Sequence, residues 1–376
     1  MVVDAWDHPF NGTVVSARRF VAALTTQGFR FHLLTIGREP LPFGCERFAF
    51  PELRIPGVRR LIDSMRTPLA RPQRHVHEAL RGCDLLHVQY PFLLGHAAIG
   101  AARSLGLPVL CSFHVQPENL LRNLGIDNSR LCKVLYAGFL DRIYQRADHV
   151  VAPSNFAADL LRRAGLRRPL SVISNGVPEA MLELPRRPAE DGRFRVLSVG
   201  RLAAEKDQAT LIEALAGSRH KANITLHLVG IGPLANTLAA HARRHGLDAH
   251  VGAVDDAALI DHYARADLVV HCGRVELEGM SVLEAMASGN AVLVADSEDS
   301  AASRLIDDPA WRFPAGNAEA LAARIDDVLA SSASRQDAGR ANRLAAGSHS
   351  HSRSAQALAE LYRSLVSTGV APAWQN

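Results

Sequence analysis

The chain has 376 residues, of which 48% are hydrophobic and 21% charged, so its composition excludes a disordered or collagen-like protein and its length predicts two domains. No apolar run approaches the roughly 18 to 20 residues of a membrane helix, and no basic and then apolar leader opens the chain, so we expect a cytoplasmic protein. The five cysteines are scattered and form no CxxC pair, so we expect neither disulfides nor structural zinc. The net charge of +4 is unevenly distributed: residues 1 to 188 carry 24 Lys and Arg against 15 Asp and Glu, while the remainder carries 18 against 23. The basic first half fits an acidic partner, but it also fits solubility alone.

The first half alternates predicted strands with predicted helices. Residues 2–5 form a short strand, Asn11 and Gly12 form a tight turn, and Thr13 is the expected N-cap of a helix with apolar residues at helical spacing. Gly12 would let a ligand approach the backbone closely, although a turn that only opens a helix explains it as well. Further strands are predicted at residues 31–36, 85–88 and 109–113, and residues 149–154 are a strand with its loop. Residues 172–178 close the first half.

A basic amphipathic segment interrupts this alternation. Six arginines between residues 54 and 74 are interleaved with aliphatic residues and methionine, and prolines limit any helix to about residues 57–67. Residues 53–74 could therefore lie on an anionic membrane surface. A solvated helix face packed on its own domain is the simpler interpretation, and both stay open.

Two histidines lie on neighbouring strands of the first half. His87 lies inside the strand at residues 85–88, and His114 directly follows the strand at residues 109–113. The carboxyl ends of parallel strands face the crevice in which open α/β sheets bind ligands, so His114 is a candidate ligand contact. A purely structural histidine is the alternative.

Residues 184–193 are polar, contain two prolines and a glycine, and predict a linker. The second half then begins with a strand at residues 196–199, and its following loop carries Arg201 and Lys206. Two cations in such a loop can bind a diphosphate, the arginine through its planar fork and the lysine as a point charge. Solvated surface cations are the alternative interpretation of this pair.

The turn at Gly230 and Gly232 lacks the third glycine and the later acidic residue of a dinucleotide site. A nicotinamide-dependent oxidoreductase is therefore disfavoured. Strands continue to alternate with helices up to a last amphipathic helix at residues 353–367, and this alternation predicts parallel sheets.

The stretch ELEGMSVLEAMASG carries the most informative motif of the second half. Residues 267–271 before it predict a buried strand and residues 279–287 a helix, so Glu276 lies in the connecting loop and Glu284 inside the helix. An anion would be bound by the first N–H groups of this helix, those of Gly279, Met280 and Ser281. Because carboxylates suit hydroxyl groups and not phosphate, the motif predicts a ligand that joins a sugar to a phosphate.

Four segments of the second half, GRLAAEKD, VGIGP, HYARAD and ELEGMSVLEAMASG, resemble the retaining glycosyltransferases of family 4, and NGT, SFH, APSNF and SNGV extend the resemblance weakly through the first half. The resemblance implies the GT-B fold, an α/β architecture of two Rossmann-like doubly wound parallel-sheet domains that face an inter-domain cleft. The implied organisation is an N-terminal acceptor domain at 1–183, a linker at 184–193, a nucleotide-sugar domain at 194–350, and a C-terminal helix at 351–376 that packs back toward the first domain.

The resemblance also implies roles for single residues. Arg201 and Lys206 match the cations that neutralise the donor diphosphate, Glu276 matches the glutamate that binds the transferred sugar, and His114 matches a histidine beside the reacting sugar. These four are the catalytic candidates. The remaining donor-binding candidates are the ribose-binding match Glu284, the loop glycine Gly12, and the helix start at Gly279, Met280 and Ser281.

Departures from the family pattern put the identity of the sugar in doubt. Glu278 stands where an aromatic residue is common and adds a third carboxylate, and Ala291 replaces a usual proline. Asn11 replaces a glycine often found before Gly12, and His271-Cys272-Gly273 replaces the usual proline-serine ending of the strand.

The expected function is transfer of a hexose, with retention, from a UDP- or GDP-sugar to a hydroxyl of an envelope lipid or glycan. No DxD triad is present, so we expect neither a metal nor another cofactor, and no nucleic-acid partner. The expected location is the cytoplasm, with a peripheral position at the inner face of the membrane as an option. The alternative is a catalytically inactive GT-B-like protein that binds sugar nucleotides, and the complete set of cations and glutamates disfavours it. A GT-B epimerase or phosphorylase is also less favoured, because no pyridoxal-lysine motif is evident.

Overall fold

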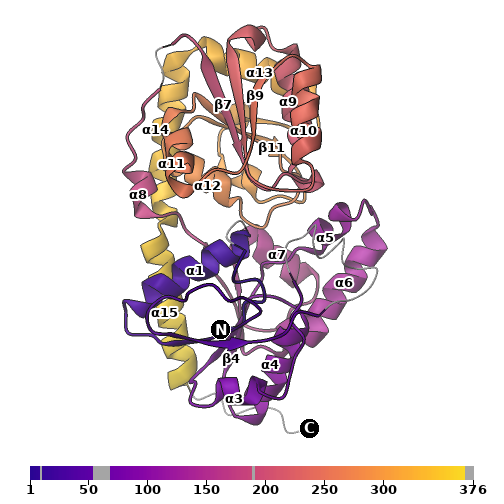
Figure 1. Cartoon of the computed structure of the whole chain (residues 1–376), viewed down its shortest axis with the longest axis vertical. Helices are drawn as coiled ribbons and strands as arrows, with labels where there is room; N and C mark the ends of the chain where they lie inside the picture. The colour runs from indigo at the N-terminus through magenta and orange to yellow at the C-terminus, as the bar shows by residue number, and fades with distance from the viewer. Residues whose placement is uncertain (9–10, 54–67, 189–190, 369–376) are drawn as a thin grey trace. The chain divides into compact units, whose positions relative to one another are not determined.

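The computed structural model describes residues 1–8, 11–53, 68–188 and 191–368. The chain forms two compact units: unit 1 comprises Met1–Asn175 with Ser352–Asn376, and unit 2 comprises Gly176–His351 (Figure 1). The helix predicted at 57–67 lies outside the described residues, and so does most of the basic segment 53–74, for which membrane contact and packing on its own domain both stay open. In the described part of the chain, no helix has both the length and the apolar composition to span a bilayer.

Unit 1 is built on parallel strands that meet at the first residues of the chain. Val2 pairs with Leu34 of β1 (Phe31–Thr35) on one side and with Val88 of β3 (Leu86–Val88) on the other, so the short strand predicted there joins two groups of strands. On the side of β1 lies β2 (Cys45–Ala49). On the side of β3 follow, in order, β4 (Val109–Ser112), β5 (His149–Ala152) and β6 (Leu170–Val172).

Two local predictions for unit 1 need correction. Asn11, and not Thr13, caps α1 (Gly12–Thr25), because its extended backbone lets its side chain accept a hydrogen bond from the Thr13 N–H at 3.0 Å. Strand β2 was not predicted, because it is a partly exposed edge strand that carries Glu46 and Arg47 and so lacks an apolar alternation.

The last helix of the chain belongs to the core of unit 1. The α-helices described for this unit are α1, α3 (Val76–Leu80), α4 (Leu93–Ser104), α5 (Pro117–Asn123), α6 (Ser129–Arg142), α7 (Asn155–Arg163) and α15 (His351–Ser367). The buried face of α15, which includes Leu358 and Tyr362, packs in one cluster with Val3 and Leu33. The Tyr362 hydroxyl lies 2.6 Å from Nδ1 of the buried His87. Residues far apart in the sequence therefore form one hydrophobic core.

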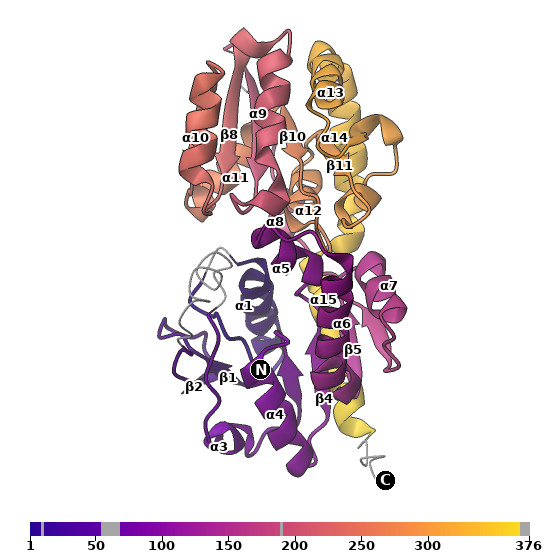
Figure 2. The same ribbon diagram turned by 90° about the vertical axis from the view of Figure 1, so that its right-hand side faces the viewer.

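Unit 2 contains a six-stranded parallel sheet with helices on both faces, as Figure 2 shows. Its strand order is β12 (Arg312–Pro314), β11 (Val292–Asp296), β10 (Leu268–His271), β7 (Phe194–Val199), β8 (Ile224–Val229) and β9 (Asp248–Gly252). One core cluster joins alternate strand residues to α9 (Gln208–Gly217), α10 (Ala235–Arg244) and α13 (Ala318–Ala330). A second cluster joins the intervening residues to α8 (Glu179–Leu182), α11 (Asp256–Arg265), α12 (Met280–Ala287) and α14 (Ser332–Ala346). The predicted doubly wound α/β architecture is confirmed.

Unit 2 begins earlier in the chain than the predicted linker. Val177 pairs with Ser350, so the chain enters unit 2 shortly after β6, within the segment 172–178 that was expected to close the first half. The buried Leu184 belongs to a core cluster of unit 2, and its carbonyl accepts a hydrogen bond from Nη2 of Arg343 at 2.6 Å. The first residues of the 184–193 segment are therefore packed on unit 2.

The loops that follow β7 and β8 interlock through their backbones. The Leu202 N–H donates to the Ile231 carbonyl at 3.0 Å, and the Leu202 carbonyl accepts from the Leu234 N–H at 3.0 Å. A Cβ at Gly230 would overlap the carbonyl oxygen of Gly200, and a Cβ at Gly232 would overlap that of Leu202. The two glycines of the VGIGP turn thus allow the close approach that fixes the loop carrying Arg201 and Lys206.

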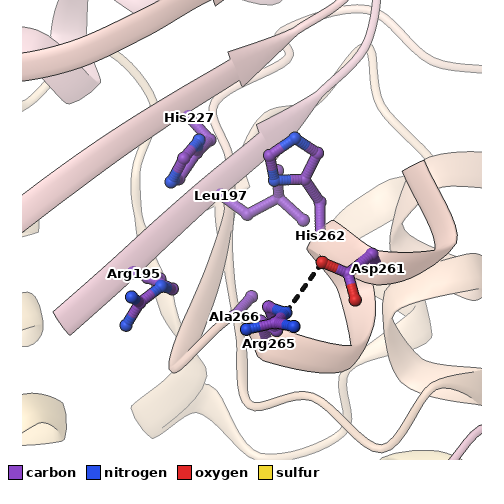
Figure 3. Close-up of a pocket in the computed structure, with 7 residues that line it drawn as sticks. All are labelled: Arg195, Leu197, His227, Asp261, His262, Arg265 and Ala266. Carbon is purple, nitrogen blue, oxygen red and sulfur yellow. Dashed lines mark ion pairs between the residues drawn. The ribbon is translucent and has the colours of Figure 1, made fainter. Parts of the chain in front are cut away.

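A cavity of about 230 Å³ opens between β7, β8 and α11 (Figure 3). Figure 3 shows His227 and His262 on its wall, beside the ion pair of Asp261 with Arg265. The His227 ring also stacks on that of His250, with centroids 5.0 Å apart. Burial, and then the neighbouring His262, His250 and Arg195, lower the pKa of His227 to about 4. This cavity lies along the middle and beginning of β7, away from the loops that carry the predicted site.

We expect Gly232→Ala to destabilise unit 2 by about 1 to 3 kcal/mol, because the added methyl group must displace the backbone of the preceding loop. Thermal unfolding measures this effect. The control is Gly217→Ala, at the end of α9, where a Cβ meets no atom and alanine favours the helix. Equal melting temperatures for the two variants would contradict the interlocked loops.

We expect the free energy of unfolding to fall as the pH is lowered from 6.5 toward 4. In this range the unfolded state protonates His227, whereas the folded state keeps it neutral down to about pH 4. Because the side chain is only half-buried, we expect about 1 to 2 kcal/mol from this residue. Urea unfolding at several pH values should show a shallower pH dependence for His227→Gln, and an unchanged one for the exposed control His77→Gln.

Candidate functional site

The loops after β7 and β10 lie side by side because these two strands are neighbours in the sheet of unit 2. The Arg274 N–H donates to the Glu205 carbonyl at 2.8 Å, and the Arg274 guanidinium forms an ion pair with Asp207 at 2.7 Å. Asp207 has a left-handed backbone with φ of 48°. Two motifs that are about 70 residues apart in the sequence thus become one surface at the carboxyl edge of the sheet.

Lys206 and Glu276 form a direct ion pair across these loops. Nε2 of His271 lies 3.3 Å from the same Glu276 oxygen. Burial alone would raise the pKa of Glu276, but the Lys206 charge and the neighbouring His271 outweigh it and lower the pKa to about 2. Glu276 is therefore ionised at neutral pH, and it can only accept hydrogen bonds.

Arg201 lies in the same loop as Lys206 and is also close to a carboxylate. Its Nη1 is 3.6 Å from Oε1 of Glu205, a side chain that is 1% exposed. The Gln208 side chain donates to the Arg201 carbonyl at 2.8 Å. The loop therefore presents its guanidinium from a fixed backbone, with a buried carboxylate behind it.

The predicted anion site corresponds to the N-terminus of α12. Gly279 precedes this helix with φ of 96°, and a Cβ there would lie 3.1 Å from that of Ala302, so glycine is needed for both conformation and space. The first intrahelical donor is the Val282 N–H, which bonds the Gly279 carbonyl at 2.9 Å. The N–H groups before it, those of Gly279, Met280 and Ser281, have no intrahelical acceptor and can bind an anion.

Glu284 lies in the second turn of α12. Its Oε2 accepts a hydrogen bond from the Tyr263 hydroxyl at 3.3 Å, and the same hydroxyl is 3.4 Å from the Ser281 carbonyl. Tyr263 is buried in α11. The orientation of Glu284 therefore depends on a residue that sequence reasoning did not single out.

Unit 1 carries the two remaining candidates, Gly12 and His114. Gly12 is the first residue of α1, directly after Asn11, whose Oδ1 also accepts from the Tyr90 hydroxyl at 3.1 Å. Nε2 of His114 is 3.0 Å from Oε1 of Gln89, and burial lowers the pKa of His114 to about 4. His114 is therefore a neutral imidazole at physiological pH.

The structure thus gathers Arg201, Lys206, Glu276, Gly279, Met280, Ser281 and Glu284 in unit 2, and it places Gly12 and His114 in unit 1. The partners that sequence reasoning missed are Glu205, Asp207, Arg274 and Tyr263. Three of them lie in segments that carry the family resemblance, Glu205 and Asp207 in GRLAAEKD and Tyr263 in HYARAD, but nothing in the sequence assigned them to the site. Glu278 is buried, at 4% exposed. His271, which contacts Glu276, did give a signal in the sequence, because it departs from the family pattern.

Two family models match adjacent parts of the chain. Glycosyl transferases group 1 matches residues 183–345, and Glycosyltransferase Family 4 matches residues 10–180. Together they cover most of both units.

Curated relatives match about three fifths of the chain. Alpha-monoglucosyldiacylglycerol synthase of Streptococcus pneumoniae is 28% identical over 56% of this chain and 51% of its own length. A GDP-mannose-dependent alpha-mannosyltransferase of Mycolicibacterium smegmatis is 32% identical over 61% of each. The chain thus spans about half to three fifths of the length of these relatives.

Solved structures share the fold over nearly the whole chain. Sucrose-phosphate synthase from Thermosynechococcus elongatus superposes with a TM-score of 0.74 at 21% identity, covering 95% of this chain and 94% of that one. Anabaena HepE in complex with UDP and glucose has a TM-score of 0.73 at 18% identity, covering 96% and 98%. With both family models and this shared fold, the chain belongs to the family 4 type of glycosyltransferases with the GT-B fold.

Proposed function

We propose that this protein transfers a hexose from a UDP- or GDP-sugar to a hydroxyl group of an envelope lipid or glycan, with retention of the anomeric configuration. The names of two relatives support the classes of substrate, since one is a synthase of a glucosylated diacylglycerol and the other a GDP-mannose-dependent mannosyltransferase. The excess of cations in residues 1 to 188 suits an anionic lipid, and we assign the acceptor to unit 1.

The observation that carries the proposal is the ionised Glu276, paired with Lys206 and connected through His271 to the first turn of α12. A ligand that fits this surface must bring an anion for the cations and the helix N-terminus, together with hydroxyl groups for the carboxylate. A sugar joined to a diphosphate has both. Glu284, held by Tyr263, would bind the ribose hydroxyls of the same donor.

The proposed reaction follows from where charge develops. The acceptor oxygen forms a bond to the anomeric carbon while the bond from that carbon to the diphosphate oxygen breaks, and the acceptor proton passes to the departing diphosphate on the same face of the sugar. Arg201, Lys206 and the α12 amides stabilise the negative charge of the leaving group. Since a diphosphate leaves readily, no carboxylic general acid is needed. His114, as a neutral imidazole, would exchange hydrogen bonds with a sugar hydroxyl.

We further propose that the reaction needs no divalent metal, because two cationic side chains and a helix N-terminus already face the diphosphate. Transfer measured with EDTA should then equal transfer measured with Mg²⁺. A rate that falls at least tenfold with EDTA and returns with Mg²⁺ would contradict this part of the proposal.

A catalytically inactive protein that binds sugar nucleotides is the second candidate, and it keeps the same donor site. Thermal stabilisation by UDP- and GDP-sugars identifies the nucleotide in either case, because a ligand bound only by the folded state raises the melting temperature. Release of free sugar from the stabilising donor, or its transfer to an acceptor extract, separates an enzyme from a binding protein.

We expect Glu276→Gln to lower the transfer rate by about 100-fold or more, since the variant loses a charged hydrogen bond to the sugar worth about 2 to 4 kcal/mol in the transition state. Binding of the nucleoside diphosphate alone should persist, because its phosphate partners remain. The control is Glu319→Gln, an exposed residue of α13, which should leave the rate unchanged. Full activity of Glu276→Gln would refute the proposed role.

A further inference from the structure

His271 is the last residue of β10, and its polar side chain is buried next to Glu276. It is 4% exposed. Its Nε2 lies 3.3 Å from Oε1 of Glu276, and its Nδ1 lies 3.5 Å from Oγ of Ser281. One imidazole therefore touches both the loop that holds the carboxylate and the first turn of the helix that is proposed to bind the diphosphate.

The space for this ring depends on Gly273. A Cβ built at Gly273 would lie 2.5 Å from Nε2 and 3.1 Å from Cε1 of His271, so a larger residue would push the ring away from Glu276. The chain departs from the family pattern at both positions, with histidine and glycine instead of the usual proline-serine ending. The two departures complement each other sterically.

The carboxylate of Glu276 determines where the imidazole needs a proton. Because an ionised carboxylate only accepts hydrogen bonds, Nε2, which faces it, must carry a proton to interact favourably, and the Ser281 hydroxyl can serve Nδ1 either as donor or as acceptor. Nε2 is buried, and within the described residues it has no hydrogen bond of good geometry. A donor that is close to a carboxylate but poorly aligned can strengthen its bond when the carboxylate moves.

We infer that His271 is a positioning residue that holds the Glu276 carboxylate toward the sugar when Lys206 turns to the donor diphosphate. This inference rests on the proposed role of Glu276 in binding the sugar. Lys206 has a single ammonium group that must serve both Glu276 and the diphosphate. His271 supplies the second donor that keeps the carboxylate in place after that exchange, and its link to Ser281 connects this position to the helix that receives the phosphate.

The test compares His271→Leu with His271→Gln, whose side-chain amide offers an N–H close to the position of Nε2. His271→Leu should lower kcat about 10- to 100-fold while the affinity for the nucleoside diphosphate changes less than about threefold. His271→Gln should recover at least a third of the wild-type kcat. If His271 acted only in packing, the two variants would lose activity alike or would change melting temperature without this split in kcat, and either result would overturn the inference.

A double-mutant cycle shows whether His271 acts through Glu276. In the Glu276→Gln background, His271→Leu should cause no further loss of kcat, whereas independent effects would multiply. Gly273→Ala should reproduce the loss in the wild-type background and have little effect in His271→Leu. If Glu276→Gln itself keeps full activity, the proposed function of the carboxylate fails; if Glu276→Gln is inactive and His271→Leu is not, only the present inference fails.

Discussion

The ion pair between Lys206 and Glu276 connects two loops that are separated by 70 residues in the sequence. It can form only because β7 and β10 are neighbours in the parallel sheet, so that the loops at their carboxyl ends begin side by side. The pair of Arg274 with Asp207 repeats the connection. Burial would raise the pKa of Glu276, but the Lys206 charge and the neighbouring His271 lower it to about 2, and this keeps its carboxylate ionised in a largely buried position. On the proposed function, the chemistry of the site depends on this carboxylate, which accepts hydrogen bonds and donates none.

Cations and carboxylates alternate around the site. Lys206 pairs with Glu276, and Arg201 lies near Glu205. The ion pair of Arg274 with Asp207 is the third of these pairs. On the proposed function, a bound diphosphate must therefore compete with carboxylates that already neutralise these cations, and the competition costs free energy. A ligand that also presents hydroxyl groups offers the displaced carboxylates new partners. Inorganic phosphate brings no sugar hydroxyls, so this arrangement favours a complete nucleotide sugar over a simple anion.

Much of this arrangement could be predicted from the sequence, because it depends on local patterns. Apolar runs located the buried strands, and the strand-loop-helix order at Gly279 placed a helix N-terminus at the carboxyl edge of the sheet. The partners that orient the motif residues could not be predicted in this way. Tyr263, for example, reaches Glu284 because α11 and α12 pack on the same face of the sheet, which is a tertiary contact without a local pattern. The edge strand β2 was missed because none of its five residues is buried, so no alternation of apolar and polar residues marks it in the sequence.

The dependence of unit 1 on the end of the chain is a further consequence of tertiary packing that no local pattern reveals. Leu33 is fully buried in a cluster that includes Leu358 and Tyr362 of α15, and without this helix that surface would be exposed to water. The buried His87, whose pKa burial lowers well below its ordinary value, would also lose the Tyr362 hydroxyl as a partner. Since all of unit 2 lies between these segments in the sequence, unit 1 cannot complete its core before unit 2 has been synthesised. The N-terminal half alone therefore lacks part of its hydrophobic core, although its strand pattern is that of a complete domain.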